Sequence, residues 1–138
     1  MKKITKGQVS LEYLLIITAF FAALSIIIPS SAFALEQFLS ASDTILAKQI
    51  YSTMEEQNEL FLFLGNNSKK EFEFVPAQKI ILKTQGNNFE ISSQQKTFSL
   101  TLRDNQISKE KEFTKKFKIL LKKENEKIII EFEEVSVT

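Results

Sequence analysis

Residues 13–35 read YLLIITAFFAALSIIIPSSAFAL, and these 23 residues contain no charged side chain. As a helix this stretch is about 35 Å long, which covers the roughly 30 Å hydrocarbon core of a bilayer. A buried helix that is apolar on every side would need a larger domain around it than 138 residues supply. The stretch therefore predicts a membrane-inserting helix.

The composition of the whole chain excludes several classes of function. The chain has neither His nor Cys, so it lacks the commonest general base, the commonest metal ligand, and any disulfide or thiolate site. Its three glycines, at 7, 65 and 86, are too scattered for a phosphate-binding loop. The formal net charge of +1 gives no reason to expect nucleic acid. We therefore expect no enzyme activity, no cofactor, no metal site and no nucleic-acid partner.

A basic leader precedes the apolar stretch, and it contains Lys2, Lys3 and Lys6. Basic residues tend to stay on the cytoplasmic side of a membrane, so the N-terminus is expected to remain there. An ordinary secretory signal would be cut after the apolar stretch, where residues 30–32 and 32–34 offer small side chains. A signal that is cut before the stretch would keep the helix in the mature protein.

Glu12 is the unusual residue at the start of the apolar stretch. A charge near the bilayer centre costs a few kcal/mol, and less near the interface. One interpretation is that Glu12 is a helix-start carboxylate near the positive end of the helix dipole, with Ser10 as the N-cap. The other is that a positively charged partner neutralises it.

The residues around the leader form a motif, Lys6-Gly7-Gln8-Val9-Ser10-Leu11-Glu12-Tyr13-Leu14-Leu15. This motif resembles the class III signal peptide of archaeal type IV pilins, with Ile16 where that family usually has Leu. The resemblance implies that a prepilin peptidase cuts between Gly7 and Gln8 and that Gln8, Ser10, Glu12 and Tyr13 direct processing and assembly. It also implies that the new amine of Gln8 pairs with Glu12 of a neighbouring subunit. The resemblance covers the leader and the apolar stretch, and the remaining residues carry no motif that matches a family.

A second helical pattern follows Pro29, a residue that usually kinks or ends a helix. Steps of three and four place the following residues on one face: Leu35, Phe38, Leu39, Ser42, Ile45, Leu46, Gln49, Ile50, Met54, Gln57, Leu60, Phe61 and Leu64. Asp43 is expected on the opposite, polar face together with Glu36, Lys48, Glu55, Glu56 and Glu59. We expect one long helix from about Val9 to Leu64, kinked near Pro29 and capped at Gly65-Asn66.

From residue 71 the periodicity changes to two, which is typical of strands. Strands are expected at 71–75, 79–84, 89–92, 97–102, 116–121 and 128–135, with turns at 86–88, 103–106 and 122–127. The expected fold class is α+β, a long N-terminal hydrophobic helix followed by a small antiparallel β-sheet head. The expected parts are a cleaved leader at 1–7, a helix at 8–64 and a head at 65–138. Within the helix, residues 8–35 form the transmembrane segment or filament core and residues 36–64 are amphipathic.

Three features of the head have a structural interpretation and a functional one. Asn66-Asn67-Ser68 fits the N-x-Ser acceptor pattern, which makes Asn66 a candidate for N-glycosylation. Lysines between 109 and 123 alternate with glutamates, and we interpret them as a mixed, soluble surface. The 13 Phe residues are interpreted as core packing.

The resemblance thus implies a structural subunit, a major or minor pilin, of an archaeal type IV pilus-like surface filament with a role in adhesion. Its expected partners are the prepilin peptidase, the membrane and other pilin subunits. The precursor is expected in the membrane with a cytoplasmic N-terminus, and the mature protein in an extracellular filament. The alternatives are a membrane-anchored or secreted binding module and an archaellin-like subunit. Alternating glutamates such as Glu71 and Glu73 are more typical of a solvent face than of a catalytic pair.

Overall fold

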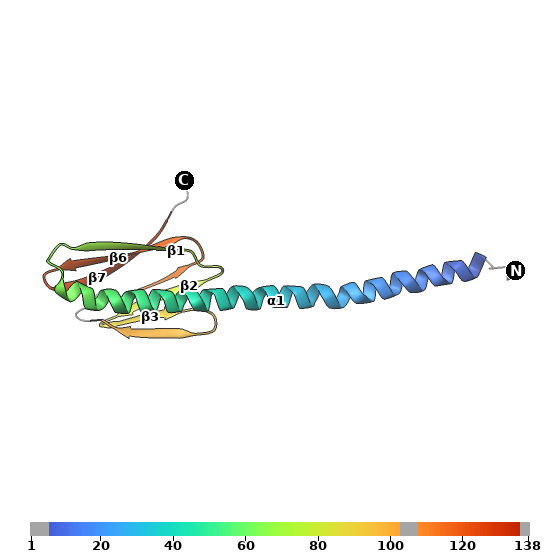
Figure 1. Cartoon of the computed structure of the whole chain (residues 1–138), viewed down its shortest axis with the longest axis horizontal. Helices are drawn as coiled ribbons and strands as arrows, with labels where there is room; N and C mark the ends of the chain where they lie inside the picture. The colour runs from blue at the N-terminus through green and yellow to red at the C-terminus, as the bar shows by residue number, and fades with distance from the viewer. Residues whose placement is uncertain (1–5, 103–107, 136–138) are drawn as a thin grey trace. The chain divides into compact units, whose positions relative to one another are not determined.

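The computed structural model describes residues 6–102 and 108–135, with side chains from residue 10 onward. In this part of the chain, one helix precedes seven strands (Figure 1). They are α1 (Lys6–Phe63), β1 (Lys69–Phe74), β2 (Ile80–Gln85), β3 (Asn88–Ser92), β4 (Thr97–Thr101), β5 (Lys109–Phe113), β6 (Phe117–Glu124) and β7 (Lys127–Glu134). The predicted α+β class, a long N-terminal helix followed by antiparallel strands, is confirmed.

Contacts divide the chain into two compact units between Gln37 and Phe38. The described part of the first unit is helix α1 up to Gln37, and it has no strand to pack against within that unit. The second unit contains the rest of α1 and all seven strands. The second half of the helix is therefore part of the head.

The strands form two antiparallel sheets, not the single sheet of about six strands that the sequence predicts. The three-stranded sheet has the order β1-β6-β7, and the four-stranded sheet has the order β4-β3-β2-β5. The sequence misses β5 because four of its five residues are exposed and charged, and only Phe113 is buried. An alternation of Lys and Glu carries no apolar period of two. The predicted turn at 103–106 lies outside the described residues.

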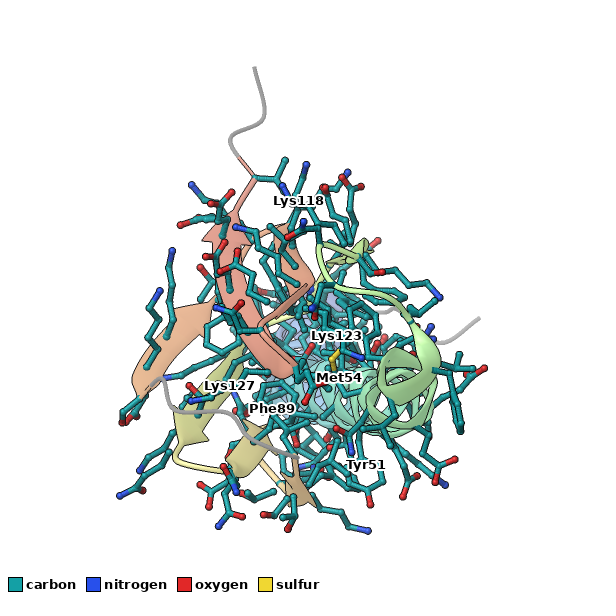
Figure 2. All side chains as sticks on the ribbon, turned by 90° about the vertical axis from the view of Figure 1, so that its left-hand side faces the viewer. Tyr51, Met54, Phe89, Lys118, Lys123 and Lys127 are labelled. Carbon is teal, nitrogen blue, oxygen red and sulfur yellow. The ribbon has the colours of Figure 1, made fainter. Side chains whose placement is uncertain are left out.

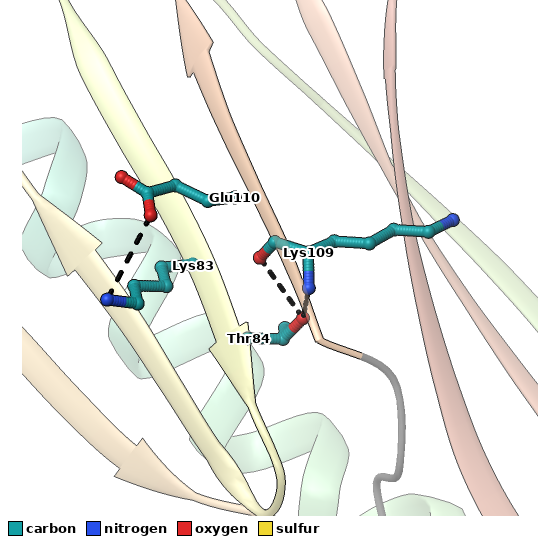
Figure 3. A network of polar contacts seen from close by, with 4 residues as sticks. All are labelled: Lys83, Thr84, Lys109 and Glu110. Carbon is teal, nitrogen blue, oxygen red and sulfur yellow. Dashed lines mark hydrogen bonds and ion pairs between the residues drawn. The ribbon is translucent and has the colours of Figure 1, made fainter.

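Polar contacts hold β5 against β2, as Figure 3 shows. The Thr84 hydroxyl donates to the backbone carbonyl of Lys109 at 3.3 Å and accepts from the Lys109 amide at 3.1 Å. Lys83 and Glu110 lie opposite each other in the register, with Nζ and Oε2 3.9 Å apart. The apolar anchor of β5 is Phe113, whose ring stacks on Phe117 with 4.4 Å between centroids.

The hairpin of β6 and β7 follows the sequence prediction. The two-residue turn uses Asn125 at φ 50° and Glu126 at φ 66°, and positive φ at both positions is the requirement of a type I′ turn. A charge pair joins the two strands, since Lys122 Nζ lies 2.7 Å from Glu131 Oε2. The six Phe residues of the core support the packing interpretation of the aromatic composition; they are Phe61, Phe74, Phe89, Phe113, Phe117 and Phe132.

One stripe of α1 closes the core of the second unit. The stripe repeats at steps of three and four and contains Ser40, Asp43, Ala47, Ile50, Met54, Gln57 and Phe61, all of them buried. Its apolar members join buried residues from both sheets in a single cluster. In Figure 2, Met54 of the helix and Phe89 of β3 both lie toward the middle of the unit. The helix therefore provides the cover that neither small sheet has by itself.

The predicted helix face is only partly correct, and the errors lie toward both of its ends. Ile50, Met54, Gln57 and Phe61 are buried as expected, but Phe38 and Ile45 are each 70% exposed. Leu60 and Leu64, also predicted on the buried face, are 45% and 42% exposed. Asp43, predicted on the polar face, is completely buried.

Asp43 is buried because its carboxylate binds the loop between β1 and β2. Oδ1 accepts from the amide of Ala77 at 2.7 Å, and Oδ2 accepts from the amides of Gln78 and Lys79 at 2.9 and 2.8 Å. Three backbone donors compensate the charge without an opposite charge, since hydrogen bonds to an ionised group are the strong ones. Asp43 therefore connects the helix to the sheet through the loop.

Lys123 binds backbone groups at the C-terminal end of α1. Its Nζ donates to the backbone carbonyls of Phe61, Leu62 and Leu64 at 2.9, 3.2 and 2.7 Å. The last carbonyls of a helix lack intrahelical partners, and a cation is favoured at the negative end of the dipole. The sequence predicted a cap at Gly65-Asn66, but Gly65 is not among the residues with positive φ. The cap is instead a lysine from β6, labelled in Figure 2.

The start of α1 also differs from the prediction. The helix begins at Lys6 and not near Val9, so Ser10 and Glu12 lie inside it and Ser10 is not its N-cap. The helix continues through Pro29 without a break. The hydroxyls of Ser30 and Ser31 donate to the carbonyls of Ile26 and Ile27 at 2.8 and 2.9 Å, within the turn that the proline disturbs.

Replacing Asp43 by Ala should destabilise the second unit by roughly 3 kcal/mol, because three backbone amides lose the buried carboxylate that accepts from them. The measurement is urea unfolding of the full chain in non-ionic detergent, in a Tyr13→Phe background. Tyr51, whose ring lies 6.0 Å from that of Phe98, is then the only tyrosine fluorophore and reports on this unit. The exposed Glu56→Ala on the same helix is the control, and equal stability of the two variants would contradict the role of Asp43.

Candidate functional site

The apolar part of α1 is exposed all around the helix. Apart from the half-buried Leu24, the large apolar side chains between Leu11 and Leu35 have exposed fractions from 52% at Ile17 to 70% at Ile26. Within the described part of the chain, α1 is the helix that is long and apolar enough to cross a membrane. The most apolar stretch of α1 is not buried by any other part of the described protein. If this surface stayed in water, the protein would forgo the favourable free energy of burying it, which is about 25 cal/mol per Å² of apolar area.

Two faces of this segment differ in the size of their side chains. Steps of three and four place Leu14, Ile17, Phe21, Leu24, Ile28, Ser31 and Leu35 along one line, which is bulky except at Ser31. The same steps place Thr18, Ala22, Ser25, Pro29 and Ala32 along another line. The segment thus has one bulky apolar side and one side of small residues.

The hydroxyl groups of the apolar segment need no external partner. Thr18 Oγ1 donates to the carbonyl of Leu14 at 2.7 Å, and Ser25 Oγ donates to the carbonyl of Ala22 at 2.7 Å. The hydroxyls of Thr18, Ser25, Ser30 and Ser31 are therefore satisfied within the helix, as placement in a hydrocarbon environment requires. Pro29 has no amide hydrogen, so the backbone ladder lacks one donor there.

The motif residues of the sequence prediction lie in the first turns of α1. Gly7 and Gln8 have helical backbone, and Ser10, Glu12 and Tyr13 follow on the same helix with exposed side chains. Gln8 and Glu12 are four positions apart, so they occupy neighbouring turns of one helix face. Lys2 and Lys3 of the predicted leader lie outside the described residues, and Lys6 is the first residue of the helix.

The charged residues of the head pair with one another. Lys116 and Lys118, from the end of the loop before β6 and from β6, form ion pairs with Glu73 and Glu71 of β1. The hydrogen bond from Lys116 lowers the pKa of Glu73, and the hydrogen bond to Glu71 raises the pKa of Lys118. These pairs account for glutamates and lysines that could otherwise indicate a catalytic pair or a basic patch.

A hollow on the head lies at the lower size limit of a small-molecule site. This hollow is lined by Lys79, Ile81, Ser92, Ser93 and Gln94 and has a volume of about 290 Å³. Small-molecule sites usually begin at roughly 300 Å³ and contain convergent polar groups. Among residues 6–102 and 108–135, no three acidic side chains gather closely enough to hold a metal ion.

Asn66 lies at an exposed turn between α1 and β1. Its Oδ1 accepts from the amide of Glu126 at 3.2 Å. The sequence motif is thus surface-exposed and placed beside the β6–β7 hairpin. Sequence reasoning missed Asp43 and Lys123, which fix the helix, because a buried carboxylate and a buried ammonium bound to backbone groups leave no residue pattern.

No protein-family model matches the chain, and neither a curated protein nor a solved structure is similar enough to count as a match.

Ala23→Arg should sharply lower the fraction of protein that inserts into the membrane. A cation at the centre of the apolar segment raises the free energy of insertion by roughly 2.5–3.5 kcal/mol. The matched control is Ala41→Arg, another exposed alanine of α1 that lies in the second unit. The measurement is the fraction of protein that stays with membranes after alkaline extraction. Equal fractions for the two variants would show that residues 13–35 do not lie in lipid.

Proposed function

We propose that this chain is the precursor of a structural subunit, a pilin, of an archaeal type IV pilus-like surface filament. A prepilin peptidase trims it after Gly7, and the subunit then assembles through its apolar helix with the head outside. A role in surface attachment follows from this placement. The expected partners are the peptidase, the membrane and further pilin subunits.

The observation that carries the proposal is the exposure of α1 up to Leu35 on every side. A head of this size does not cover such a segment, so its surface needs either lipid or other copies of the same helix. A filament subunit uses both, lipid before assembly and copies after it. A simple membrane anchor uses only the first, and it has no need of the Gly7-Gln8 motif in front of the helix.

Cleavage after Gly7 changes the charge at the membrane surface. Removing Lys2, Lys3 and Lys6 leaves 15 basic against 17 acidic side chains. Lysines next to an apolar helix hold it at the cytoplasmic face, where each contributes about 1 kcal/mol of attraction to anionic lipid. Their loss reduces the barrier to moving the helix out of the bilayer.

The same cut creates an amine at Gln8, one turn before Glu12. A carboxylate or an amine buried alone in an apolar assembly is strongly unfavourable, whereas the pair is tolerated. Pairing between neighbouring subunits then fixes the axial position of each helix. Glu12 is exposed in the single chain, so it is accessible to a partner.

Gly7 should be required for processing. Gly in a helix is about 1 kcal/mol less favourable than Ala, so the turn that contains the scissile bond opens easily. Gly7→Leu should leave the chain uncut, and Gly65→Leu, at a glycine with open space around it, should leave cutting unchanged. The measurement is the N-terminal mass of protein from membranes or shed filaments of the natural host.

Three masses have distinct meanings for the proposal. A chain that begins at Gln8, or at its cyclised form, agrees with prepilin processing. A chain that begins near Phe33 or Leu35 contradicts the proposal and indicates a secreted binding module. An intact Met1 also contradicts it and leaves a membrane anchor. An archaellin-like subunit would share the Gln8 terminus, and loss of swimming without loss of attachment in a deletion strain would identify it.

Glu12→Ala should be processed normally but should reduce filament yield at least tenfold. The physical reason is the loss of the partner for the Gln8 amine, which corresponds to more than 1.4 kcal/mol per subunit contact. Glu36→Ala, an exposed carboxylate further along α1, is the control. Filaments counted by electron microscopy decide the result, and normal filaments from Glu12→Ala would refute its role in register.

A further inference from the structure

The last turn of α1 presents an exposed aromatic side chain. Phe63 is 88% exposed, more than any other large apolar residue in the described part of the chain, and Leu62 and Leu64 beside it are 43% and 42% exposed. These residues lie far along the sequence from the apolar stretch at 13–35, so lipid does not explain them. Phe61, two positions earlier, is completely buried. Phe63 is therefore aimed away from the core on a helix end that the Lys123 ammonium fixes.

The N-x-Ser motif begins three residues after Phe63, and it is the one such motif in the 138 residues. Its residues form a tight turn, in which the Ser68 amide donates to the Gly65 carbonyl at 3.3 Å and Asn67 has φ 70°. Positive φ at the third position of a turn is the requirement of type II. Asn66 is then the residue at the outer corner.

Backbone bonds hold this turn to β6. The amide of Asn67 donates to the carbonyl of Lys123 at 2.8 Å, and the amide of Lys123 donates to the carbonyl of Ser68 at 2.9 Å. Lys123 thus fixes both the helix end, through its side chain, and the turn, through its backbone. As a result Phe63 and Asn66 belong to one rigid corner of the head.

The side chain of Asn66 is oriented for modification. Its Oδ1 accepts from the Glu126 amide at 3.2 Å, so the bond uses the oxygen and not the nitrogen of the amide. The space next to the turn is open, because a Cβ built on Gly65 meets no atom within 4 Å.

We propose that Asn66 carries an N-linked glycan and that its first sugar packs on the ring of Phe63. The C–H face of a hexose ring is apolar and its hydroxyls lie at the edge, so it covers an aromatic ring while the hydroxyls stay in water. A sugar in this position would cover the ring of Phe63, which packs neither in the core nor next to the apolar stretch at 13–35. The inference rests on the proposed function, since it needs the head on the outer side of the membrane.

The reaction is a glycosyl transfer from a lipid-linked sugar phosphate. Asn66 Nδ2 forms a bond to the anomeric carbon, and the bond from that carbon to the phosphate oxygen breaks. The lipid phosphate leaves with the electron pair, and one amide proton passes to a base of the transferase. The product is a glycosylated amide, and no oxidation or reduction occurs.

The first part of the test is peptide mass mapping of the full chain from its natural host. Trypsin releases residues 49–69, which contain both Phe63 and the acceptor motif. This peptide should be heavier by the mass of a glycan, and fragmentation should place the added mass on Asn66. Asn66→Gln and Ser68→Ala should lose the added mass, Ser68→Thr should keep it, and Asn87→Gln is the control at another exposed turn.

The second part tests the contact with Phe63. The glycosylated chain and the same chain from a host without the transferase are compared by thermal unfolding in detergent. The glycan should raise the midpoint by several degrees in the natural sequence and in Leu62→Ala, and should not raise it in Phe63→Ala. An equal rise in all three proteins would refute the packing on Phe63.

The outcomes separate this inference from the proposed function. An unmodified peptide from a chain that begins at Gln8, and whose head is digested by protease added to intact cells, overturns the glycan alone. A head that is protected in intact cells overturns the proposed function, and the glycan with it. A modified Asn66 together with a Gln8 terminus supports both.

Discussion

The second unit depends on one stripe of α1 that two buried charged groups hold in place. Asp43 binds three amides of the loop before β2, and Lys123 binds three carbonyls at the helix end. Neither group has an opposite charge as its partner; each is compensated by backbone dipoles. Between them, Ala47, Ile50 and Met54 cover both sheets. Any rotation of the helix would break these bonds, so the charges fix which residues are buried and which, like Phe38 and Ile45, remain exposed.

The two parts of α1 share one helical backbone, but they differ in which side chains are buried. Up to Leu35 the helix is apolar all around, and its hydroxyls donate to its own carbonyls. From Ser40 onward only the stripe toward the sheets is buried, and the other side carries charges and a few apolar residues. A helix of 58 residues can be continuous across this change because backbone hydrogen bonds do not depend on the environment. Even Pro29 leaves it unbroken, with Ser30 and Ser31 bonded to carbonyls in the disturbed turn.

The sequence predicts the elements that have a clear apolar pattern. It does not predict the features that depend on hydrogen bonds between side chains and distant backbone groups. The uncharged residues 13–35 indicated the helix, and the strand patterns from residue 71 onward indicated every strand except β5. Strand β5 was missed because it is charged and pairs with β2 through Thr84 and ion pairs. Asp43 was placed on the wrong face because its hydrogen-bond donors, three amides far along the chain, have no sequence signature. The predicted Gly65 cap failed for the same reason, since the actual cap is Lys123. The motif residues lie in the first turns of α1, and their role depends on partners that a single chain does not contain.

The two proposed modifications lie at opposite ends of α1, and this arrangement constrains the topology. Cleavage at Gly7 lies directly before the apolar stretch, on the side where basic leaders stay. A lipid-linked glycan reaches Asn66 only on the outer side, and Asn66 follows the helix directly. Residues 13–35 contain no charge and cover a bilayer, whereas residues 36–63 are amphipathic and packed on the sheets, so only the former stretch can separate the two sides. A single molecule that carries both a Gln8 terminus and a modified Asn66 must therefore have crossed the membrane once, between these two sites. The exposed apolar surface of α1, the basic leader before it and the turn at Asn66 after it then all agree with one orientation of the helix in the membrane.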